Sequence, residues 1–413
     1  MPPMKMIRII TTAFCVLAVA LTAGAQWRFL PESDTIPESS VTISLLTCAP
    51  GADVYELNGH SGLRMQFDGI DAVANWGLFD FDSPNFIYRF VKGETDYCVG
   101  IASTDSFLDY YRRNNRRVTE QILNLTPAQA AKVVELVETN LRPENRVYRY
   151  NYVKDNCATR PLGIIEKATG AEITFNTTAS QLGQSPTFRS EMRYYHRNYP
   201  WYQFGIDLAL GSGIDYPISP RETVFSPVVL KQLVAAATVT GSDGKQKPLV
   251  SRTEILVDGP ADGPVLTPTP PYATPMAAML ALLLVAAIIT LLDQRRHRLS
   301  RWFDALLFGV FGLEGCIIAF LVFVSVHEAT SPNWLLLWLN PLCLIVPITV
   351  WIRPLAEYLK IYHICNIVAI LALAFAGCIG LQTLNMAFLP TMGAGILRSY
   401  NFICLSSEKT KQP

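Results

Sequence analysis

Charged residues are scarce in this chain of 413 residues: Asp, Glu, Lys and Arg together account for 16% of it, and hydrophobic residues for 50%. Soluble proteins carry about 25% charged residues, so part of this apolar surface must face lipid. The chain also lacks net charge, because 34 basic residues balance 34 acidic ones. The charge balance therefore gives no indication of a nucleic-acid partner, and we expect none.

Cofactor motifs are missing too. The sequence contains no metal-ligand cluster, no phosphate-binding loop and no dinucleotide fingerprint. We therefore expect neither a cofactor nor a metal ion, and any chemistry must come from the side chains of the protein itself.

The N-terminus has the pattern of a secretory signal peptide. Lys5 and Arg8 precede an apolar run over residues 9–21, and small residues follow at 23–25. Signal peptidase cleaves after such a small-residue site, so we expect residues 1–25 to be removed and the following domain to be exported. The alternative is an uncleaved anchor helix, which the short apolar run disfavours.

The rest of the chain divides by composition into three parts. Residues 26–257 form an exported globular domain, with strand-like alternation first and helix-like periodicity later. Residues 258–272 are a linker, because the stretch 258–271 holds five prolines and two glycines. We expect residues 273–386 to form a four-helix transmembrane domain, and residues 387–413 a short possible fifth span and a tail.

Four apolar runs in the membrane part are long enough to cross a hydrocarbon core of about 30 Å. Glu314 lies in the middle of the second run, where an ionised carboxylate is costly, and a functional role and a packing role both stay open. Pro390, several glycines and Arg398 weaken the possible fifth span. The four runs are 275–292, 302–326, 333–352 and 364–384.

Basic residues set the orientation of these runs. Four arginines between Arg295 and Arg301 follow the first run, and Arg353 and Lys360 follow the third. Loops rich in Lys and Arg stay in the cytoplasm, so both loops are expected there and the exported domain on the opposite side. The sequence thus predicts a multi-pass protein of the cell inner membrane with its N-terminal domain in the periplasm.

The exported domain contains three cysteines, Cys48, Cys98 and Cys157. In an oxidising compartment an odd count leaves one thiol free. Cys157 is our choice, because Pro161 places the start of a helix at or very near Cys157 and Gly170 ends it. The helix N-terminus would lower the pKa of the thiol and offer backbone amides to an oxyanion. The alternative is a buried structural cysteine.

A base is available for this thiol. Only His60 and His196 lie in the exported domain, and His60 has small neighbours that leave space around its ring. His196 lies among tyrosines and an arginine and is expected at the surface or at the lipid interface. In a strand, alternation would put His60, Gly62, Arg64 and Gln66 on one face and Leu63, Met65 and Phe67 on the other.

The third member of the candidate site is less well determined. A tight turn at residues 68–69 should return the chain as a second strand over residues 73–81. Asp80 is then the polar residue nearest His60 and the candidate to orient the imidazole. A slip of one residue would bring Phe79 opposite His60 and leave Asn75 facing Arg64, so Asn75 stays as the alternative.

At these motifs the sequence resembles the Lnb-type membrane proteins of Bacteroidetes. The resemblance implies an α+β fold, with a circularly permuted papain-like thiol domain of antiparallel strands and helices followed by an all-α transmembrane bundle. It also implies lipoprotein N-acylation, in which Cys157, His60 and Asp80 move an acyl chain from a phospholipid to the N-terminal amine of a diacylglyceryl lipoprotein. The matching segments are LTCAPG (46–51), GHSGLR (59–64), NWGLFDF (75–81), DNCATR (155–160), SVH (325–327), NW (333–334) and NPL (340–342).

Two other functions stay open beside this one. The first is a membrane-anchored thiol hydrolase of cell-wall peptides, which would rarely need four spans. The second is a non-catalytic envelope assembly protein, against which Cys157 and the open surroundings of His60 argue. One departure from the family pattern is Gly62, where alanine is more frequent, and another is the irregular C-terminal tail.

The topology can be tested with reporter fusions. A reporter fused near Gly241 should be active only outside the cytoplasm, and one fused at Arg298 only inside it, because the signal peptide exports the first and the arginine-rich loop retains the second. A cytoplasmic signal from the fusion at Gly241 would contradict the predicted orientation.

Overall fold

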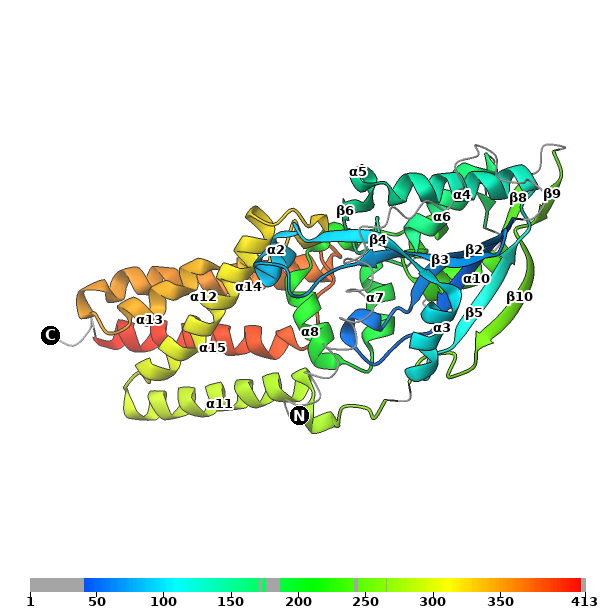
Figure 1. Ribbon diagram of the computed structural model, residues 1–413. Helices are drawn as coiled ribbons and strands as arrows, with labels where there is room; N and C mark the ends of the chain where they lie inside the picture. Colours follow the sequence, from blue (N-terminus) through cyan, green and yellow to red (C-terminus); the bar gives the residue numbers. More distant parts are fainter. Residues whose placement is uncertain (1–40, 171–172, 176–185, 241–243, 265, 410–413) are drawn as a thin grey trace.

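The computed structural model describes residues 41–170, 173–175, 186–240, 244–264 and 266–409, so the signal peptide predicted for residues 1–25 lies outside the described residues. An α+β domain built on an antiparallel sheet is followed by a helical bundle (Figure 1), as the sequence predicted. The strands of the main sheet are β1 (Thr42–Cys48), β2 (His60–Phe67), β3 (Ile70–Leu78), β4 (Asp96–Ser103), β5 (Val118–Leu123), β6 (Val147–Arg149) and β10 (Val250–Val257).

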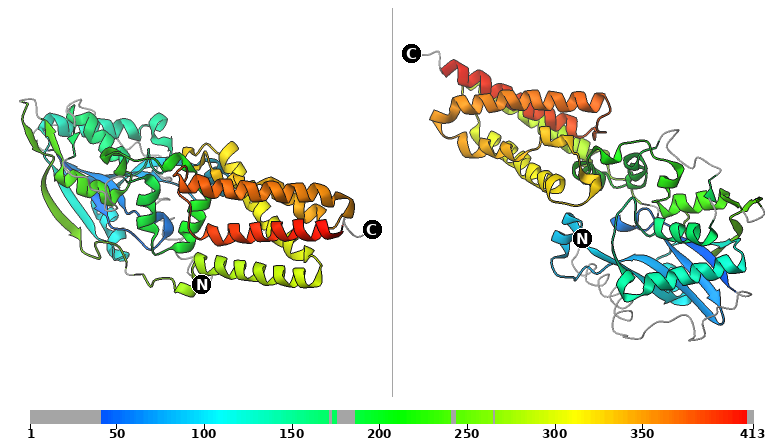
Figure 2. Two further views of the ribbon diagram at one scale, coloured as in Figure 1. Left: turned by 180° about the vertical axis from the view of Figure 1, so that it is seen from behind. Right: turned by 90° about the horizontal axis from the view of Figure 1, so that it is seen from above.

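The seven strands are arranged in the order β10-β5-β1-β2-β3-β4-β6, and every neighbouring pair is antiparallel. Helices cover both faces (Figure 2). The larger core lies under α4, α6 and α10, and α3 packs on the other face. These helices are α3 (Thr104–Arg113), α4 (Pro127–Leu141), α6 (Thr159–Thr169) and α10 (Pro227–Ala236). A smaller sheet contains β7 (Ile173–Thr174), β8 (Thr238–Thr240) and β9 (Gln246–Pro248).

The hairpin of β2 and β3 forms at the predicted turn, where Asp68 and Gly69 have φ values of 45° and 77°. Two left-handed residues in a row match the twist of a two-residue hairpin, so Phe67 pairs directly with Ile70. The predicted register is wrong, because the second strand begins at Ile70 and not at 73. The strand also ends at Leu78, so Asp80 lies beyond it, and the ladder pairs Gly62 with Asn75.

The membrane part contains α11 (Pro275–Arg296), α12 (Arg301–Phe323), α14 (Ala356–Cys378) and α15 (Phe388–Lys409). By length and composition, three helical segments of the described residues could span a membrane: Pro275–Arg296, Arg301–Phe323 and Arg353–Cys378. The third apolar run does not form the continuous helix that we expected. It is divided into η5 (Trp334–Leu337), η6 (Pro341–Leu344) and α13 (Ile345–Thr349).

Side-chain caps and prolines account for this division. Asn333 and Asn340 each accept a hydrogen bond from the backbone N–H two residues later and so begin new helical turns. Pro341 and Pro347 lack the N–H that a continuous helix would need. The run still packs between α12 and α14.

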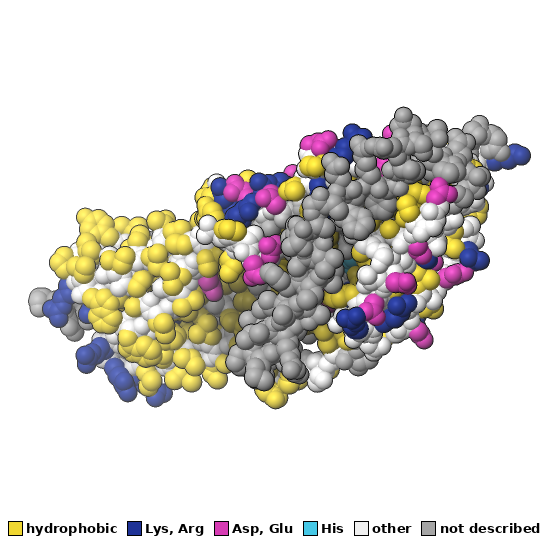
Figure 3. All heavy atoms as spheres, viewed as in Figure 1, with side chains coloured by type: hydrophobic (Ala, Val, Ile, Leu, Met, Phe, Trp, Pro, Cys, Tyr) yellow, Lys and Arg dark blue, Asp and Glu magenta, His cyan; other side chains and the backbone are white. Residues whose placement is uncertain are grey.

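The segment expected to be a short possible fifth span is the full-length helix α15, which packs against α11 and α14. Arg398, which weakened that prediction, is fully buried and binds Asp293 and Asp304, each at 2.7 Å. α15 ends beside the loop between α11 and α12, at the end of the bundle away from the domain (Figure 1). Hydrophobic side chains cover the bundle, and Lys and Arg gather at this far end (Figure 3).

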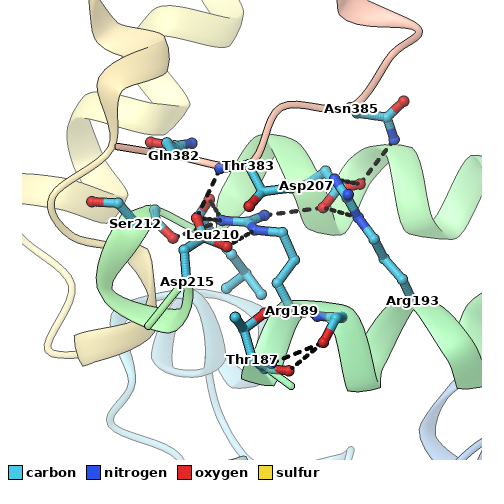
Figure 4. A network of polar contacts seen from close by, with 12 residues as sticks. Thr187, Arg189, Arg193, Asp207, Leu210, Ser212, Asp215, Gln382, Thr383 and Asn385 are labelled. Atoms are coloured by element: carbon cyan, nitrogen blue, oxygen red, sulfur yellow. Dashed lines mark hydrogen bonds and ion pairs between the residues drawn. The ribbon is translucent and has the colours of Figure 1, made fainter. Parts of the chain in front are cut away.

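A buried polar network joins the two parts of the chain (Figure 4). Its centre is Arg189 on α7 (Phe188–His196), which is 1% exposed and binds Asp207 at 3.0 Å and Asp215 at 2.6 Å. Both carboxylates also accept hydrogen bonds from the loop before α15: Asp207 from the Asn385 side chain and Asp215 from the Thr383 backbone. The same carboxylates thus bind both the domain and the bundle.

Backbone contacts extend this joint. The N–H groups of Gly211 and Ser212, which follow α8 (Pro200–Ala209), donate to the carbonyls of Ala329 and Pro332 at 2.9 and 2.7 Å. The remaining short helices of the described residues are η1 (Val54–Glu56), α2 (Phe86–Lys92), α5 (Pro143–Arg146), η2 (Ser212–Ile214), α9 (Pro220–Thr223), η3 (Pro271–Ala273), η4 (Glu328–Thr330) and η7 (Arg353–Leu355).

Replacing Arg189 by Ala should destabilise the protein by about 3–5 kcal/mol, because Asp207 and Asp215 would stay buried without their shared cation. Arg193→Ala is the matched control: this arginine also binds Asp207 but is 30% exposed, so its loss should cost less. Thermal unfolding of the full chain in detergent measures both. Equal losses for the two variants would contradict a central role for Arg189.

Candidate active site

Cys157 lies in the loop between β6 and α6, and the side chain of Asn156 orders that loop. Asn156 Oδ1 accepts hydrogen bonds from the N–H groups of Ala158 and Thr159 at 2.8 and 3.0 Å, and its Nδ2 donates to the carbonyl of Phe225. The helix begins at Thr159 with Ala158 as its N-cap, close to the predicted start at or very near Cys157. Cys157 therefore sits just before the helix and not in its first turn.

The sheet places the strand of His60 beside the loop of Cys157. Ser61, next to His60 in β2, donates from Oγ to the carbonyl of Cys157 at 2.6 Å. If the β2–β3 register is continued, Gly77 of β3 lies across from His60. Gly77 has a φ of 90° and lies where the pairing of β3 with β4 is irregular. A Cβ there would lie 3.7 Å from Cys157 Cβ and 3.3 Å from the Tyr150 ring, so glycine permits the close approach of the thiol loop.

His60 binds Asn75, the alternative that the sequence left open. The distance from His60 Nε2 to Asn75 Oδ1 is 2.5 Å. An amide oxygen only accepts, so Nε2 carries the proton and Nδ1 keeps the lone pair that a general base needs. The carboxylate of Asp80 instead accepts from the backbone N–H of Asp82 in a local turn. Asp80 is thus not placed to orient the imidazole, because the strand register differs from the predicted one.

The protonation state of the thiol is also different from the prediction. Burial raises the pKa of Cys157 to about 11, although the backbone N–H of Ser61 and the hydroxyl of Tyr150 both act to lower it. Removing water from around the thiol outweighs the helix end, which begins two residues away. At neutral pH Cys157 is therefore a neutral thiol.

The imidazole is neutral as well. Desolvation lowers the pKa of His60 to about 4; the hydrogen bond to Asn75 raises it, and the positive charge of Arg116 lowers it further. A neutral imidazole has the lone pair needed to take a proton from a neutral thiol, so these protonation states are compatible with a general base and a nucleophile.

The described residues contain no disulfide between two exported cysteines that would leave a third thiol free. Cys48, Cys98 and Cys157 are all free in the described residues, so Cys157 is not left over from a pair. Cys48 pairs with His60 across the β1–β2 ladder, and burial raises the pKa of its thiol to about 12. His196 was expected at the surface or at the lipid interface but is buried and binds Gln203 at 2.9 Å.

The thiol loop lies against the membrane bundle. Lys154, three residues before Cys157, forms an ion pair with Glu328 in the turn after α12. The backbone N–H of Val326, in the same turn, donates to the carbonyl of Lys92 at 2.9 Å. The candidate site is therefore held at the end of the bundle that carries the α+β domain.

Three residues that contribute to the site were missed from the sequence: Ser61, Tyr150 and Asn156. Tyr150 had a usable signal, because tyrosines at 148, 150 and 152 alternate on a segment that leads to Cys157. Asn156 acts by accepting hydrogen bonds from the backbone just before α6, and Ser61 acts by binding the distant loop of Cys157. Local sequence patterns do not reveal such contacts.

An apolar cavity of about 270 Å³ lies elsewhere, in the bundle. It is lined by side chains of α8, α11, α12 and α15, and Glu314 supplies a carboxylate to an otherwise mostly apolar wall. The cavity does not contain Cys157 or His60, so it is separate from the candidate site.

Fold and site together define a membrane protein whose α+β domain presents a cysteine and a histidine beside the end of a helical bundle. Residues 31–190 match the family model described as the Lnb N-terminal periplasmic domain, and residues 268–410 match that of the Lnb transmembrane domain. The chain belongs to the Lnb family, which confirms the resemblance in its sequence. Comparisons with curated proteins and with solved structures gave no match.

The raised pKa of Cys157 predicts how alkylation depends on pH. The thiolate is the reactive form, so below pH 10 the rate should rise about tenfold per pH unit. Tyr150→Phe removes a hydrogen bond that lowers the pKa and should shift the profile to higher pH. Tyr97→Phe, which keeps the ring stacked on Tyr150, is the control. Labelling is followed by mass spectrometry of the peptide with Cys157; a plateau below pH 8 would contradict a raised pKa.

Proposed function

We propose that the protein is a lipoprotein N-acyltransferase, which moves an acyl chain from a phospholipid through a thioester on Cys157 to the N-terminal amine of a diacylglyceryl lipoprotein. The observation that carries this proposal is the position of Cys157 and His60 beside the membrane bundle in a chain of the Lnb family. Cys157 is the nucleophile, His60 the general base, and Asn75 replaces Asp80 as the residue that orients the imidazole.

The first half-reaction acylates the enzyme. His60 Nδ1 takes the thiol proton as the sulfur of Cys157 attacks the ester carbonyl of the phospholipid and a C–S bond forms. When the tetrahedral intermediate collapses, the ester C–O bond breaks and His60 returns the proton to the leaving alkoxide. The products are a thioester on Cys157 and a lysophospholipid.

The second half-reaction transfers the chain. The amine of the lipoprotein attacks the thioester carbonyl, and His60 takes a proton from the attacking nitrogen. The C–S bond breaks as the amide forms, and His60 returns the proton to sulfur. The backbone N–H of Ser61 and the hydroxyl of Tyr150 hydrogen-bond the sulfur and would stabilise its charge as it leaves.

The membrane bundle fits this reaction because both substrates are anchored in lipid. We place the protein in the inner membrane with several passes and the α+β domain in the periplasm, where the signal peptide and the positive-inside pattern direct it. A helix that begins just after the thiol and packs on the sheet carrying His60 also supports the circularly permuted papain-like fold that the resemblance implies.

Trapping the acyl-enzyme tests the mechanism. The full chain, incubated with phospholipid and no amine, should gain a fatty acyl mass on the peptide with Cys157, and neutral hydroxylamine should release it. Cys157→Ala should abolish the adduct, and His60→Ala should slow its formation by roughly 10²–10⁴-fold. Asn75→Ala should cost less than His60→Ala but more than Asp80→Ala, which should remain near wild type.

Mass spectrometry of envelope lipoproteins from cells with each variant separates this function from the alternatives. Loss of N-acylation with Cys157→Ala supports the acyltransferase. Full acylation by that variant would overturn the covalent mechanism. Release of cell-wall peptides without any acyl adduct would favour the thiol hydrolase.

A further inference from the structure

The short helix α2 is attached to the end of α12 that carries the α+β domain. Three residues just after α12 bind the last turn of α2. The Ser325 hydroxyl donates to the carbonyl of Val91 at 2.8 Å, and Val326 and His327 donate to the carbonyls of Lys92 and Phe90. α2 therefore extends the membrane bundle, although it comes from the α+β domain.

The outer surface of α2 is apolar. Ile87 is 78% exposed, and Tyr88 and Phe90 are also exposed. The Tyr88 ring lies 6.1 Å from that of Phe320 on α12, and Phe323 at the end of α12 is 77% exposed. The lipid-facing surface of α12 thus continues onto α2, and aromatic side chains are favoured at the level where hydrocarbon meets water.

A row of aromatic rings leads inward from α2 to the candidate site. Phe86 stacks on Phe79 with centroids 5.8 Å apart, Phe79 lies 5.0 Å from Tyr97, and Tyr97 stacks on Tyr150 at 4.4 Å. Tyr150 hydrogen-bonds the thiol of Cys157. An apolar path of contacting rings thus connects the exposed surface of α2 with the sulfur.

We propose that α2 and this aromatic row bind the acyl chain of a bilayer phospholipid and guide it to Cys157. The proposal rests on the proposed function and specifies where its lipid donor binds. Hydrocarbon is the ligand that such a surface fits, because it needs no polar partners. The two cations of α2 are already paired, Arg89 with Asp96 at 2.6 Å and Lys92 with Glu94 at 2.8 Å.

Photo-crosslinking tests the contact without depending on catalysis. The full chain with Cys157→Ala is placed in phosphatidylcholine vesicles whose acyl chains carry a diazirine, and the adducts are mapped by mass spectrometry. Adducts over residues 79–92 are expected, and Ile87→Asn should reduce them. Ile255→Asn, an exposed apolar position on β10, should not. Adducts confined to the bundle, including the cavity lined by Glu314, would overturn the proposal.

Comparing two acyl donors then shows whether α2 and the aromatic row guide the acyl chain to Cys157 or only touch lipid. Phe86→Ala should slow acylation of Cys157 by bilayer phospholipid about tenfold or more, the effect of losing one aromatic contact with the acyl chain. Acylation by a water-soluble short-chain ester should change less than twofold. Equal slowing with both donors, or slowing only of transfer to a diacylglyceryl peptide, would overturn the proposal. If no donor acylates wild-type Cys157, the proposed function fails while the crosslinks still report on α2.

Discussion

The register of the hairpin formed by β2 and β3 is the constraint on which the candidate site depends. Side chains alternate between the two faces of a strand, so a slip of one residue would turn Asn75 away from His60. The left-handed turn at Asp68 and Gly69 prevents that slip by leaving only two residues outside the ladder. The same register brings Gly77 against the loop of Cys157 and puts Asn75 within hydrogen-bond distance of His60 near the same end of the sheet.

Desolvation then decides the chemistry of the site. Burial keeps Cys157 and Cys48 protonated, and the thiolate is the form that oxidants attack. Free thiols can thereby persist in an oxidising compartment. Under the proposed function, the same burial means that His60 must remove the proton during attack. In that mechanism a site that excludes water also protects the thioester from hydrolysis until an amine arrives.

Two buried arginines hold the membrane part, one at each end. Arg398 binds Asp293 and Asp304 and fixes α15 to α11 and α12 at the far end. Arg189 binds Asp207 and Asp215 where the bundle meets the domain. Each arginine neutralises two carboxylates that would otherwise be costly to bury, so breaking either group costs more than a surface ion pair. The second group attaches the α+β domain to the loop before α15.

The amino-acid sequence alone determines the features that depend on local chemistry. They include the turn at Asp68 and Gly69, the end of α6 at Gly170, the long apolar runs and the motifs that indicate the family. Cys157 and His60 could be chosen because few nucleophiles and bases exist in the domain. Their roles stay predictions until the acyl-enzyme is sought. The other features of the fold and of the candidate site depend on contacts between segments that are distant in the chain.

The folded chain selects Asn75 over Asp80, because the second strand begins at Ile70 directly after the two-residue turn and ends at Leu78, before Asp80. The sign of the pKa shift of Cys157 depends on how much protein surrounds it, which no local pattern encodes. Arg398 argues against a span when read alone, yet it stabilises α15 once Asp293 and Asp304 lie beside it. Tertiary structure decides these points because burial and charge pairing depend on neighbours that come from other parts of the sequence.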